Sequence, residues 1–200
     1  MSNRETILQR VRTALRVAPI VPDDACIQRS LDSNTNIVAL MIDRLEDYRA
    51  IVVDAEGDVP SAVASALLQR GIAQAVIDPA LHIDFHPNDI ELIDDTGLSA
   101  RELDGIPAAI TTCAVAIAET GTIILTHAPG QGRRAISLVP DVHVCILHRE
   151  QIVGTVPEAV AQIRTPAIST WVSGPSATSD IELNRVEGVH GPRTLIVVLA

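Results

Sequence analysis

From residue 50 onward, short runs of apolar, mostly β-branched residues alternate with segments of helical periodicity. The runs that predict strands are 50–53, 73–77, 91–93, 113–125 (two strands around a turn), 142–147, 167–172 and 194–199. The segments that predict helices are 60–69, a brief turn after Ser99, 135–138 and 157–163. This alternation predicts an α/β domain built on a mostly parallel, doubly wound sheet of about seven strands, with helices on both faces.

The amino-terminal segment has a different pattern. Apolar residues recur at helical spacing among arginines in its first part, which predicts an amphipathic helix ended by Pro19 and Pro22. We expect residues 1–33 to form a helical arm packed on a single domain of residues 34–200. A second helix around residues 37–45 should be capped by Asn34 or Thr35.

The composition restricts the partners and the chemistry. The chain has a net charge of −10 and only three aromatic residues, which argues against nucleic acid and against an anionic membrane surface. All fifteen basic residues are arginines, so lysine-based catalysis and a phosphate-binding lysine are excluded. Any anion must be bound by arginine, backbone N–H groups or hydroxyls.

The cysteines and histidines predict no metal site. Cys26, Cys113 and Cys145 are too dispersed for a disulfide framework or for an iron–sulfur cluster held by this chain alone. His82 and His86 lie four apart, but the following Pro87 favours a surface loop over a helix carrying two ligands. With charges spread through its first residues and no signal-peptide or membrane-spanning pattern, the chain is expected to be cytoplasmic.

A polar break interrupts the apolar run 113–125. It contains Glu119, Thr120 and Gly121, which predict a tight turn between two strands. Glu119 is therefore either an exposed turn residue or a carboxylate held at the sheet edge as a ligand contact, base or nucleophile.

The glycine-rich segment 127–134 carries a partial nucleotide-binding pattern. Gly130 and Gly132 match half of a dinucleotide fingerprint, but the third glycine is absent. Arg133 either binds an anionic substrate through its planar guanidinium group or covers acidic surface.

The polar segment 173–192 is the main candidate for a ligand site. A turn at Gly174-Pro175 precedes Ser179 and Glu182, whose capping-box spacing predicts a short helix that Gly188 would end. If the helix starts at the carboxyl end of a strand, an anion could bind there. An ordinary strand–loop–helix connection explains the pattern equally well. The candidate ligand-binding residues are Thr120, Gly121, Arg133, Gly174, Ser176, Thr178, Asp180 and His190, and we expect Glu119, the candidate catalytic residue, to share their pocket.

Three stretches together resemble the LUD domain family. They are Ala-Glu-Thr-Gly-Thr at 118–122, Gly-Gln-Gly-Arg at 130–133 with Leu-Val-Pro-Asp-Val-His at 138–143, and Gly-Pro-Ser-x-Thr-x-Asp-Ile-Glu followed by Gly-Val-His-Gly-Pro within 174–192. The resemblance is close in the carboxyl-terminal half and extends to the amino-terminal half in layout. It departs from the family at Ala177, where relatives often carry Arg or Lys.

The resemblance implies a NagB/RpiA/CoA transferase-like fold and a role in oxidising L-lactate to pyruvate. It also implies that the iron–sulfur clusters of that system reside in partner subunits, with no cofactor in this chain. We therefore weigh an accessory subunit of a lactate-oxidising complex against a CoA-transferase-like or isomerase-like enzyme or ligand-binding protein. In the latter, Glu119 would act on a small anionic or phosphorylated compound. A folate-cyclising enzyme of similar architecture is the third alternative, less favoured because the chain has no lysine for nucleotide phosphates.

Overall fold

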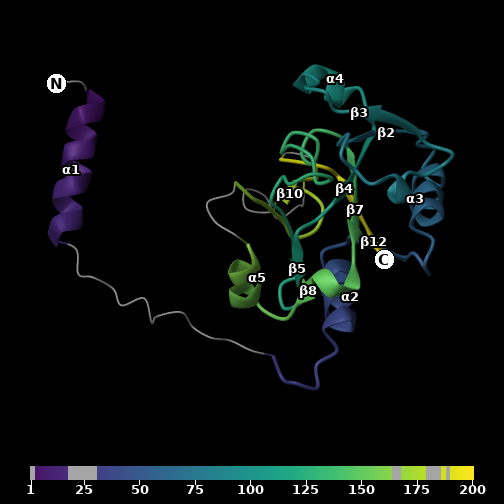
Figure 1. Ribbon diagram of the computed structural model, residues 1–200, viewed down its shortest axis with the longest axis horizontal. Coiled ribbons are helices and arrows are strands. Elements are labelled where there is room, and N and C mark those ends of the chain that lie inside the picture. Colours follow the sequence, from purple (N-terminus) through teal and green to yellow (C-terminus); the bar gives the residue numbers. More distant parts are fainter. Residues whose placement is uncertain (1–2, 18–30, 164–167, 179–185, 188–189) are drawn as a thin grey trace.

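The computed structural model describes residues 3–17, 31–163, 168–178, 186–187 and 190–200 (Figure 1). The helices are α1 (Asn3–Val17), α2 (Ile37–Asp47), α3 (Val59–Leu68), α4 (Ala100–Asp104) and α5 (Val156–Gln162). Two short 3-10 turns, η2 (Ile83–Phe85) and η3 (Arg149–Gln151), lie in the connections.

The main sheet has six strands in the order β1-β12-β7-β4-β2-β3, and all of its pairings are parallel. Its strands are β1 (Ile51–Asp54), β2 (Gln74–Ile77), β3 (Glu91–Asp94), β4 (Ala108–Thr112), β7 (Val142–Leu147) and β12 (Thr194–Leu199). This confirms the predicted α/β class with a parallel sheet. The central strand β4 was not predicted, although three of its five residues, Ile110, Thr111 and Thr112, are β-branched.

The strands predicted within 113–125 and 167–172 form a second sheet. Its order is β8-β5-β6-β9, with β5 (Val115–Ile117), β6 (Thr122–Leu125), β8 (Ile152–Val153) and β9 (Thr170–Val172). Strands β5 and β6 are the expected antiparallel hairpin, and β9 extends it antiparallel to β6. The tight turn between β5 and β6 makes their pairing antiparallel, while β8 pairs parallel with β5, so the second sheet is mixed.

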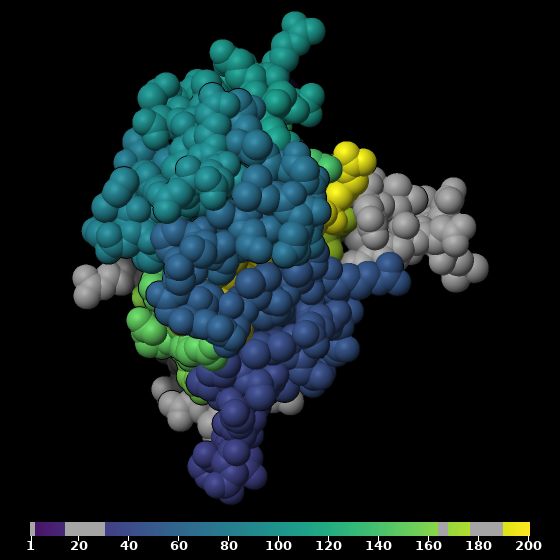
Figure 2. Space-filling model, turned by 90° about the vertical axis from the view of Figure 1, so that its right-hand side faces the viewer, coloured from purple at the N-terminus to yellow at the C-terminus, as the bar shows by residue number. Residues whose placement is uncertain are grey.

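The main sheet is covered on both faces. Helix α3 packs on one face against the side chains of Val144, Ile146, Ile196 and Val198. Helix α2 and the second sheet pack on the opposite face, and α5 lies on the outer side of the second sheet. Figure 2 shows the α3 side, where residues of about 50–110 form a continuous surface above α2.

Several helix boundaries follow from local chemistry. Asp58 caps α3 and Pro60 lies in its first turn, while Ser99 and Glu102 form the predicted capping box of α4. The cap of α2 is Asn36, not Asn34 or Thr35, since its side chain accepts from the backbone N–H of Ala39.

Two predicted helices are wrong in whole or in part. Residues 135–138 form hydrogen-bonded turns and no helix. The helix expected from Ser179 to Gly188 falls mainly outside the described residues. The part that is described, β11 (Val186–Glu187), instead pairs antiparallel with β10 (Ala177–Thr178). The pair Thr178–Val186 brings together two β-branched residues, which favour strand pairing over helix.

Helix α1 forms as predicted, and its residues Ile7, Leu8 and Val11 are exposed. That residues 1–33 pack on the domain of residues 34–200 stays a prediction. Among the described residues, no helix has the length and apolar character needed to cross a bilayer.

Candidate functional site

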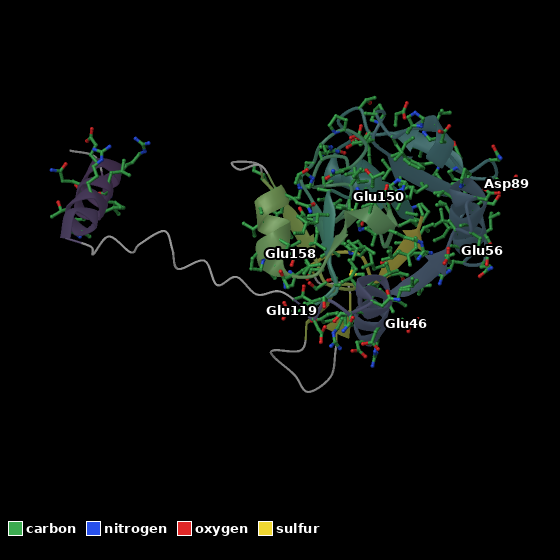
Figure 3. All side chains as sticks on the ribbon, turned by 60° about the horizontal axis from the view of Figure 1, so that its bottom comes forward. Glu46, Glu56, Asp89, Glu119, Glu150 and Glu158 are labelled. Atoms are coloured by element: carbon green, nitrogen blue, oxygen red, sulfur yellow. The ribbon has the colours of Figure 1, made fainter. Side chains whose placement is uncertain are left out.

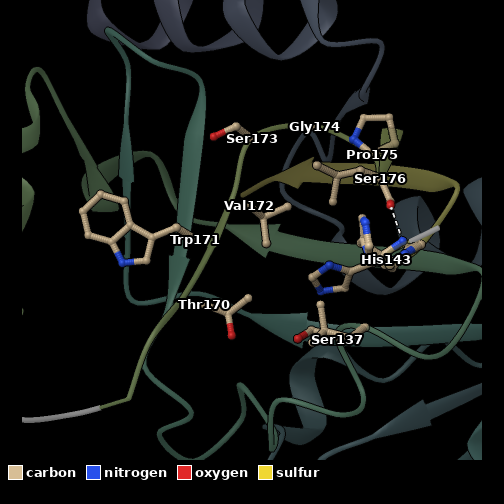
Figure 4. Close-up of a pocket in the computed structure, with 14 residues that line it drawn as sticks. Ser137, His143, Thr170, Trp171, Val172, Ser173, Gly174, Pro175 and Ser176 are labelled. Atoms are coloured by element: carbon tan, nitrogen blue, oxygen red, sulfur yellow. Dashed lines mark hydrogen bonds between the residues drawn. The ribbon is translucent and has the colours of Figure 1, made fainter. Parts of the chain in front are cut away.

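A cavity of about 290 Å³ lies between the main sheet and strand β9 (Figure 4). Its wall combines hydroxyl groups and imidazole rings with apolar side chains. The residues that line it are Ser137, Leu138, His143, Thr170, Trp171, Val172, Ser173, Gly174, Pro175, Ser176, His190, Gly191, Pro192 and Leu195.

The cavity lies at the amino ends of two strands of the main sheet. His143 is the second residue of β7, Leu195 is the second residue of β12, and the two are register partners. The expectation that the segment after residue 173 faces the carboxyl edge of the parallel sheet is therefore wrong. Strand β9 precedes that segment and belongs to the second sheet. The segment therefore lies at the amino ends of β7 and β12, opposite the carboxyl edge.

The glycine-rich loop 127–134 occupies the carboxyl edge instead. The backbone N–H of Gly132 donates to Asp78 Oδ2 at 3.0 Å, just after β2, and the backbone N–H of Thr112 at the end of β4 donates to the carbonyl of Gly130 at 3.0 Å. The loop thus fills the crevice where open parallel sheets commonly bind ligands.

Strand β9 forms one wall of the cavity through alternate side chains. In Figure 4, Thr170 and Val172 point toward His143 and Ser137, whereas Trp171 points away. The Trp171 side chain is 45% exposed and donates from Nε1 to Ser169 Oγ at 3.0 Å. This alternation is the normal two-residue period of a strand, and it places the chain's only tryptophan directly behind the cavity wall.

His143 is a buried imidazole in this cavity that sequence reasoning did not single out. Its Nε2 atom lies 2.8 Å from Thr111 Oγ1 on the neighbouring strand β4. Burial lowers the pKa of His143 to about 4, so the ring is neutral near pH 7. The sequence does carry a signal for this residue. His143 is the lone histidine in the otherwise apolar run 142–147, and a buried polar group needs a hydrogen-bond partner.

Two loops meet at Ser176. The Ser176 backbone N–H donates to the carbonyl of Pro192 at 2.8 Å, and the backbone N–H of His190 donates to Ser176 Oγ at 3.1 Å. Since the Ser176 oxygen accepts this bond, its own hydrogen remains to be donated. The loop after β9 and the loop before β12 are therefore held together at one end of the cavity.

His127 supports the opposite end. Its Nδ1 atom is 2.9 Å from the carbonyl oxygen of Gly132, and its Nε2 atom is 2.9 Å from Thr170 Oγ1. A carbonyl only accepts, so Nδ1 carries the hydrogen, and in the neutral ring Nε2 accepts from Thr170. The ring thereby ties the glycine-rich loop to the cavity wall.

The structure brings only some of the predicted site residues together. Gly174, Ser176 and His190 line the cavity. Thr178 lies in β10, and Asp180 is outside the described residues. The remaining candidates, namely Glu119, Thr120, Gly121 and Arg133, are not among the residues that line it.

Glu119 lies on the turn between β5 and β6, where its backbone N–H donates to the carbonyl of Gly154 at 3.0 Å. In Figure 3 its side chain lies at the margin of the molecule, as do those of Glu46 and Glu158. The structure therefore does not bring the Glu119 carboxylate into this cavity, and its catalytic role stays a prediction.

Arg133 is engaged away from the cavity. Its Nε and NH2 groups donate to the two carboxylate oxygens of Asp95 at 2.5 and 2.9 Å, and NH2 also donates to the carbonyl of Leu98. Burial acts to raise the pKa of Asp95, but hydrogen bonds from Arg133 and from the backbone outweigh it and lower that pKa. Arg133 thus fastens the glycine-rich loop to the turn after β3.

Two of the predicted glycines allow close packing on α2. A Cβ atom added at Gly121 would lie 2.8 Å from Arg44 Cβ, and one added at Gly174 would lie 2.5 Å from Tyr48 Cβ. Both glycines also have positive φ angles, +59° and +83°. Their common role is to let the two loops approach the carboxyl end of α2.

Within the described part of the chain, no three His, Cys, Asp or Glu side chains are grouped so as to hold a metal ion. Among the described residues, those that line the cavity offer hydroxyl and imidazole groups and include no carboxylate or guanidinium. This chemistry suits a small ligand with hydrogen-bonding oxygens.

The two stacked sheets define an α/β domain with a candidate ligand cavity between them. The family model of the LUD domain matches residues 50–200, and the chain therefore belongs to the LUD domain family. It is 47% identical over 174 residues to "Lactate utilization protein C" of Deinococcus radiodurans, covering 84% of this chain and 81% of that protein. The Lactate utilization protein C of Oceanobacillus iheyensis is 31% identical over 156 residues.

The match to the Oceanobacillus protein covers 74% of this chain and 63% of that protein, so the chain spans less than two thirds of that relative. A crystal structure of a "duf162 family protein" from Deinococcus radiodurans is 36% identical, with a TM-score of 0.69. It covers 82% of this chain and 95% of the solved one. The chain is thus a homologue of Lactate utilization protein C and shares its α/β domain.

Proposed function

We propose that this chain acts in lactate utilization as a cluster-free, cytoplasmic subunit of a system that oxidises L-lactate to pyruvate. The observation that carries the proposal is the 47% identity to Lactate utilization protein C over 84% of the chain. At this identity and coverage, two chains share a fold, and a shared role is the most direct inference.

The cysteines support placing the iron–sulfur clusters in partner subunits. Clusters are usually held by four thiolates, and this chain has three cysteines. Cys113 and Cys145 are buried in the core between the main sheet and α2, where Cys113 Sγ donates to Gln151 Oε1 at 3.6 Å. Oxidation of lactate to pyruvate releases two electrons and two protons, and the clusters of such partner subunits would accept the electrons.

We further propose that the cavity between the sheets binds a small carboxylate or phosphorylated compound. Ser176 has a hydrogen to donate, and His190 lies beside it at the cavity wall. Neutral donors give affinity through geometry, with each hydrogen bond contributing about 1 kcal/mol. A ligand-binding role of this kind is compatible with an accessory subunit and with an enzyme.

Anoxic purification of the tagged chain from its native host, grown on L-lactate, tests the subunit role. The proposal expects co-purifying proteins that carry iron and acid-labile sulfide, while the chain itself, when produced alone, contains well below one iron per molecule. Recovery of the chain without partners, or with a cluster of its own, would contradict the proposal.

A further inference from the structure

The His143 ring is presented to the cavity by its place on β7. His143 shares one face of this strand with Cys145 and Leu147, which pack in the core formed with α2 and the second sheet. The ring therefore extends toward β9, and Figure 4 shows it reaching toward Thr170 and Val172. Since His143 is 1% exposed, the cavity is the route by which a small molecule can reach the ring.

The two ring nitrogens have different surroundings. Nε2 lies 2.8 Å from Oγ1 of Thr111, which is two residues beyond Ala109, the register partner of His143 on β4. Among the residues that the structure describes, Nδ1 has no hydrogen-bond partner. Nδ1 is not sealed off either, because Thr155 Oγ1 is the one fully enclosed side-chain N or O atom of those residues that lacks a partner. Nδ1 is therefore an unpaired polar atom that is open to the cavity.

Hydrogen counting determines which nitrogen carries the ring hydrogen. Burial lowers the pKa of His143 to about 4, so the ring is neutral near pH 7 and has one hydrogen, on Nδ1 or on Nε2. If Nε2–H donated to Thr111, the hydroxyl hydrogen of this fully buried threonine would have no acceptor in the described part of the chain, which is costly. If Thr111 donates to Nε2, both atoms are satisfied. The ring hydrogen is then on Nδ1, where it faces the cavity.

We propose that His143 is a ligand-contacting residue of the cavity, whose Nδ1–H group donates to an acceptor oxygen of a bound small carboxylate. This inference rests on the proposed ligand-binding function of the cavity. Thr111 is a positioning residue, because its hydroxyl holds the ring in the tautomer that donates. A carboxylate has two acceptor oxygens, and the Ser176 hydroxyl supplies a second neutral donor in the same cavity.

Nitrogen NMR chemical shifts of the histidine rings test the tautomer without a ligand, and the spectrum of His143→Gln identifies the His143 signals. We expect the hydrogen on Nδ1 in the parent chain and in Thr111→Ser, which keeps the hydroxyl. Thr111→Val lacks the hydroxyl and should show a mixture of both tautomers. A hydrogen on Nε2 in the parent would overturn the proposal, and an unchanged tautomer in Thr111→Val would overturn the positioning role of Thr111.

Calorimetric titration with sodium L-lactate, sodium pyruvate and inorganic phosphate tests the contact itself. His143→Gln places an amide near the Nε2 position and leaves the Nδ1 position without a donor, whereas the shorter side chain of His143→Asn places its amide near Nδ1. His143→Gln should weaken binding of the two carboxylates by at least about tenfold, the factor that a hydrogen bond to a charged group gives. His143→Asn should keep more of the affinity.

The matched control is His148→Gln. His148 follows the carboxyl end of β7 and is not among the residues that line the cavity, so this variant should bind like the parent. Thermal unfolding of each variant shows that the affinities compare folded chains.

The outcomes separate this inference from the function on which it rests. Parent-like affinity in His143→Gln, or equal losses in folded His143→Gln and His143→Asn, contradicts the contact at Nδ1. Tighter binding of phosphate than of either carboxylate contradicts the ligand class. Failure of all three probes to bind the parent contradicts the proposed ligand function instead.

Discussion

At the scale of single residues, Gly121 combines a positive φ of +59° with a close approach to Arg44 Cβ. Gly121→Ala should lower the free energy of unfolding by roughly 2–4 kcal/mol, because a left-handed conformation costs about 1–2 kcal/mol for a residue with a Cβ and the contact adds overpacking. Chemical denaturation followed by Trp171 fluorescence measures this loss.

The matched control is Gly71→Ala. Gly71 has a similar φ of +71° but no atom within 4 Å of the added Cβ, so only the backbone cost of about 1–2 kcal/mol should appear. Equal losses in the two variants would show that packing on α2 contributes nothing at Gly121.

His143 makes stability depend on pH. Its pKa is about 4 in the folded chain and near 6.5 when unfolded, so the unfolded state binds more protons between these values. Stability is full above pH 6.5 and is lost as pH falls. Between pH 7.5 and pH 5, His143 should lower the free energy of unfolding by about 2 kcal/mol. This pH interval stays above the usual pKa range of carboxylates.

Urea unfolding of the parent and of His143→Gln at several pH values between 7.5 and 5 measures the effect. The variant should lose less stability than the parent over this interval. Identical pH dependence in both would mean that His143 is not held neutral by burial.

At this scale, the site residues that could be predicted from the sequence are those whose position in a loop identifies them as candidates. Gly174, Ser176 and His190 were predictable because they follow or precede apolar strand runs, where loops carry ligand groups. Arg133 could be read either as a substrate contact or as surface pairing, because only the fold brings Asp95 to it. His143 was not predicted because it lies within an apolar strand run. The pattern there indicates that a residue is buried, but it does not indicate that a cavity lies beside it.

At the scale of elements, the glycine-rich loop and the loop after β9 have separate tasks. Arg133 joins the first loop to Asp95, whose side chain is 3% exposed, so Arg133→Ala leaves a buried carboxylate without its cation. We expect a loss of about 1.5–3 kcal/mol in the free energy of unfolding, as for hydrogen bonds to charged groups. Denaturation of this variant beside Arg134→Ala, a neighbouring exposed arginine, isolates the effect.

Substitutions in the loop after β9 and in the glycine-rich loop should differ in their effect on ligand binding. Ser176→Ala should weaken binding of an anionic probe at the cavity with the fold intact, while Arg133→Ala should leave affinity unchanged and reduce stability. Titration calorimetry with both variants decides this. Weaker binding in Arg133→Ala than in Ser176→Ala would place the arginine at the ligand after all.

The strands illustrate what elements can and cannot be read from sequence. The bounds of β7 and β12 match the predicted runs 142–147 and 194–199, since both strands are buried on both faces and bordered by polar residues. The division into two sheets was not predictable from these runs, because periodicity describes each strand and not its partner. Because β9 belongs to the second sheet, the candidate site lies at the amino ends of β7 and β12 and not at the carboxyl edge, where the sequence predicted it.

At the scale of the whole molecule, the chain is acidic and lysine-free, and the cavity lies between the two sheets. In the part of the chain that the structure describes, no Asp, Glu or Arg lines this cavity. These properties favour recognition by shape and neutral hydrogen bonds over charge attraction. Family membership and the homology to Lactate utilization protein C support the proposed role in lactate utilization, and the cavity is the proposed place where this domain binds a small molecule.

Growth on L-lactate tests most directly whether this cavity serves lactate utilization. A host strain lacking the gene would be complemented with one of three chains: the parent, Ser176→Leu or Ser65→Leu. Ser176→Leu removes the loop contact and fills the cavity. Ser65→Leu is the control, because Ser65 is an exposed residue of α3 that does not line this cavity. The parent and Ser65→Leu should restore growth on L-lactate as sole carbon source, and Ser176→Leu should not, although it accumulates as folded protein. Growth of the Ser176→Leu strain at the parent rate would contradict the account.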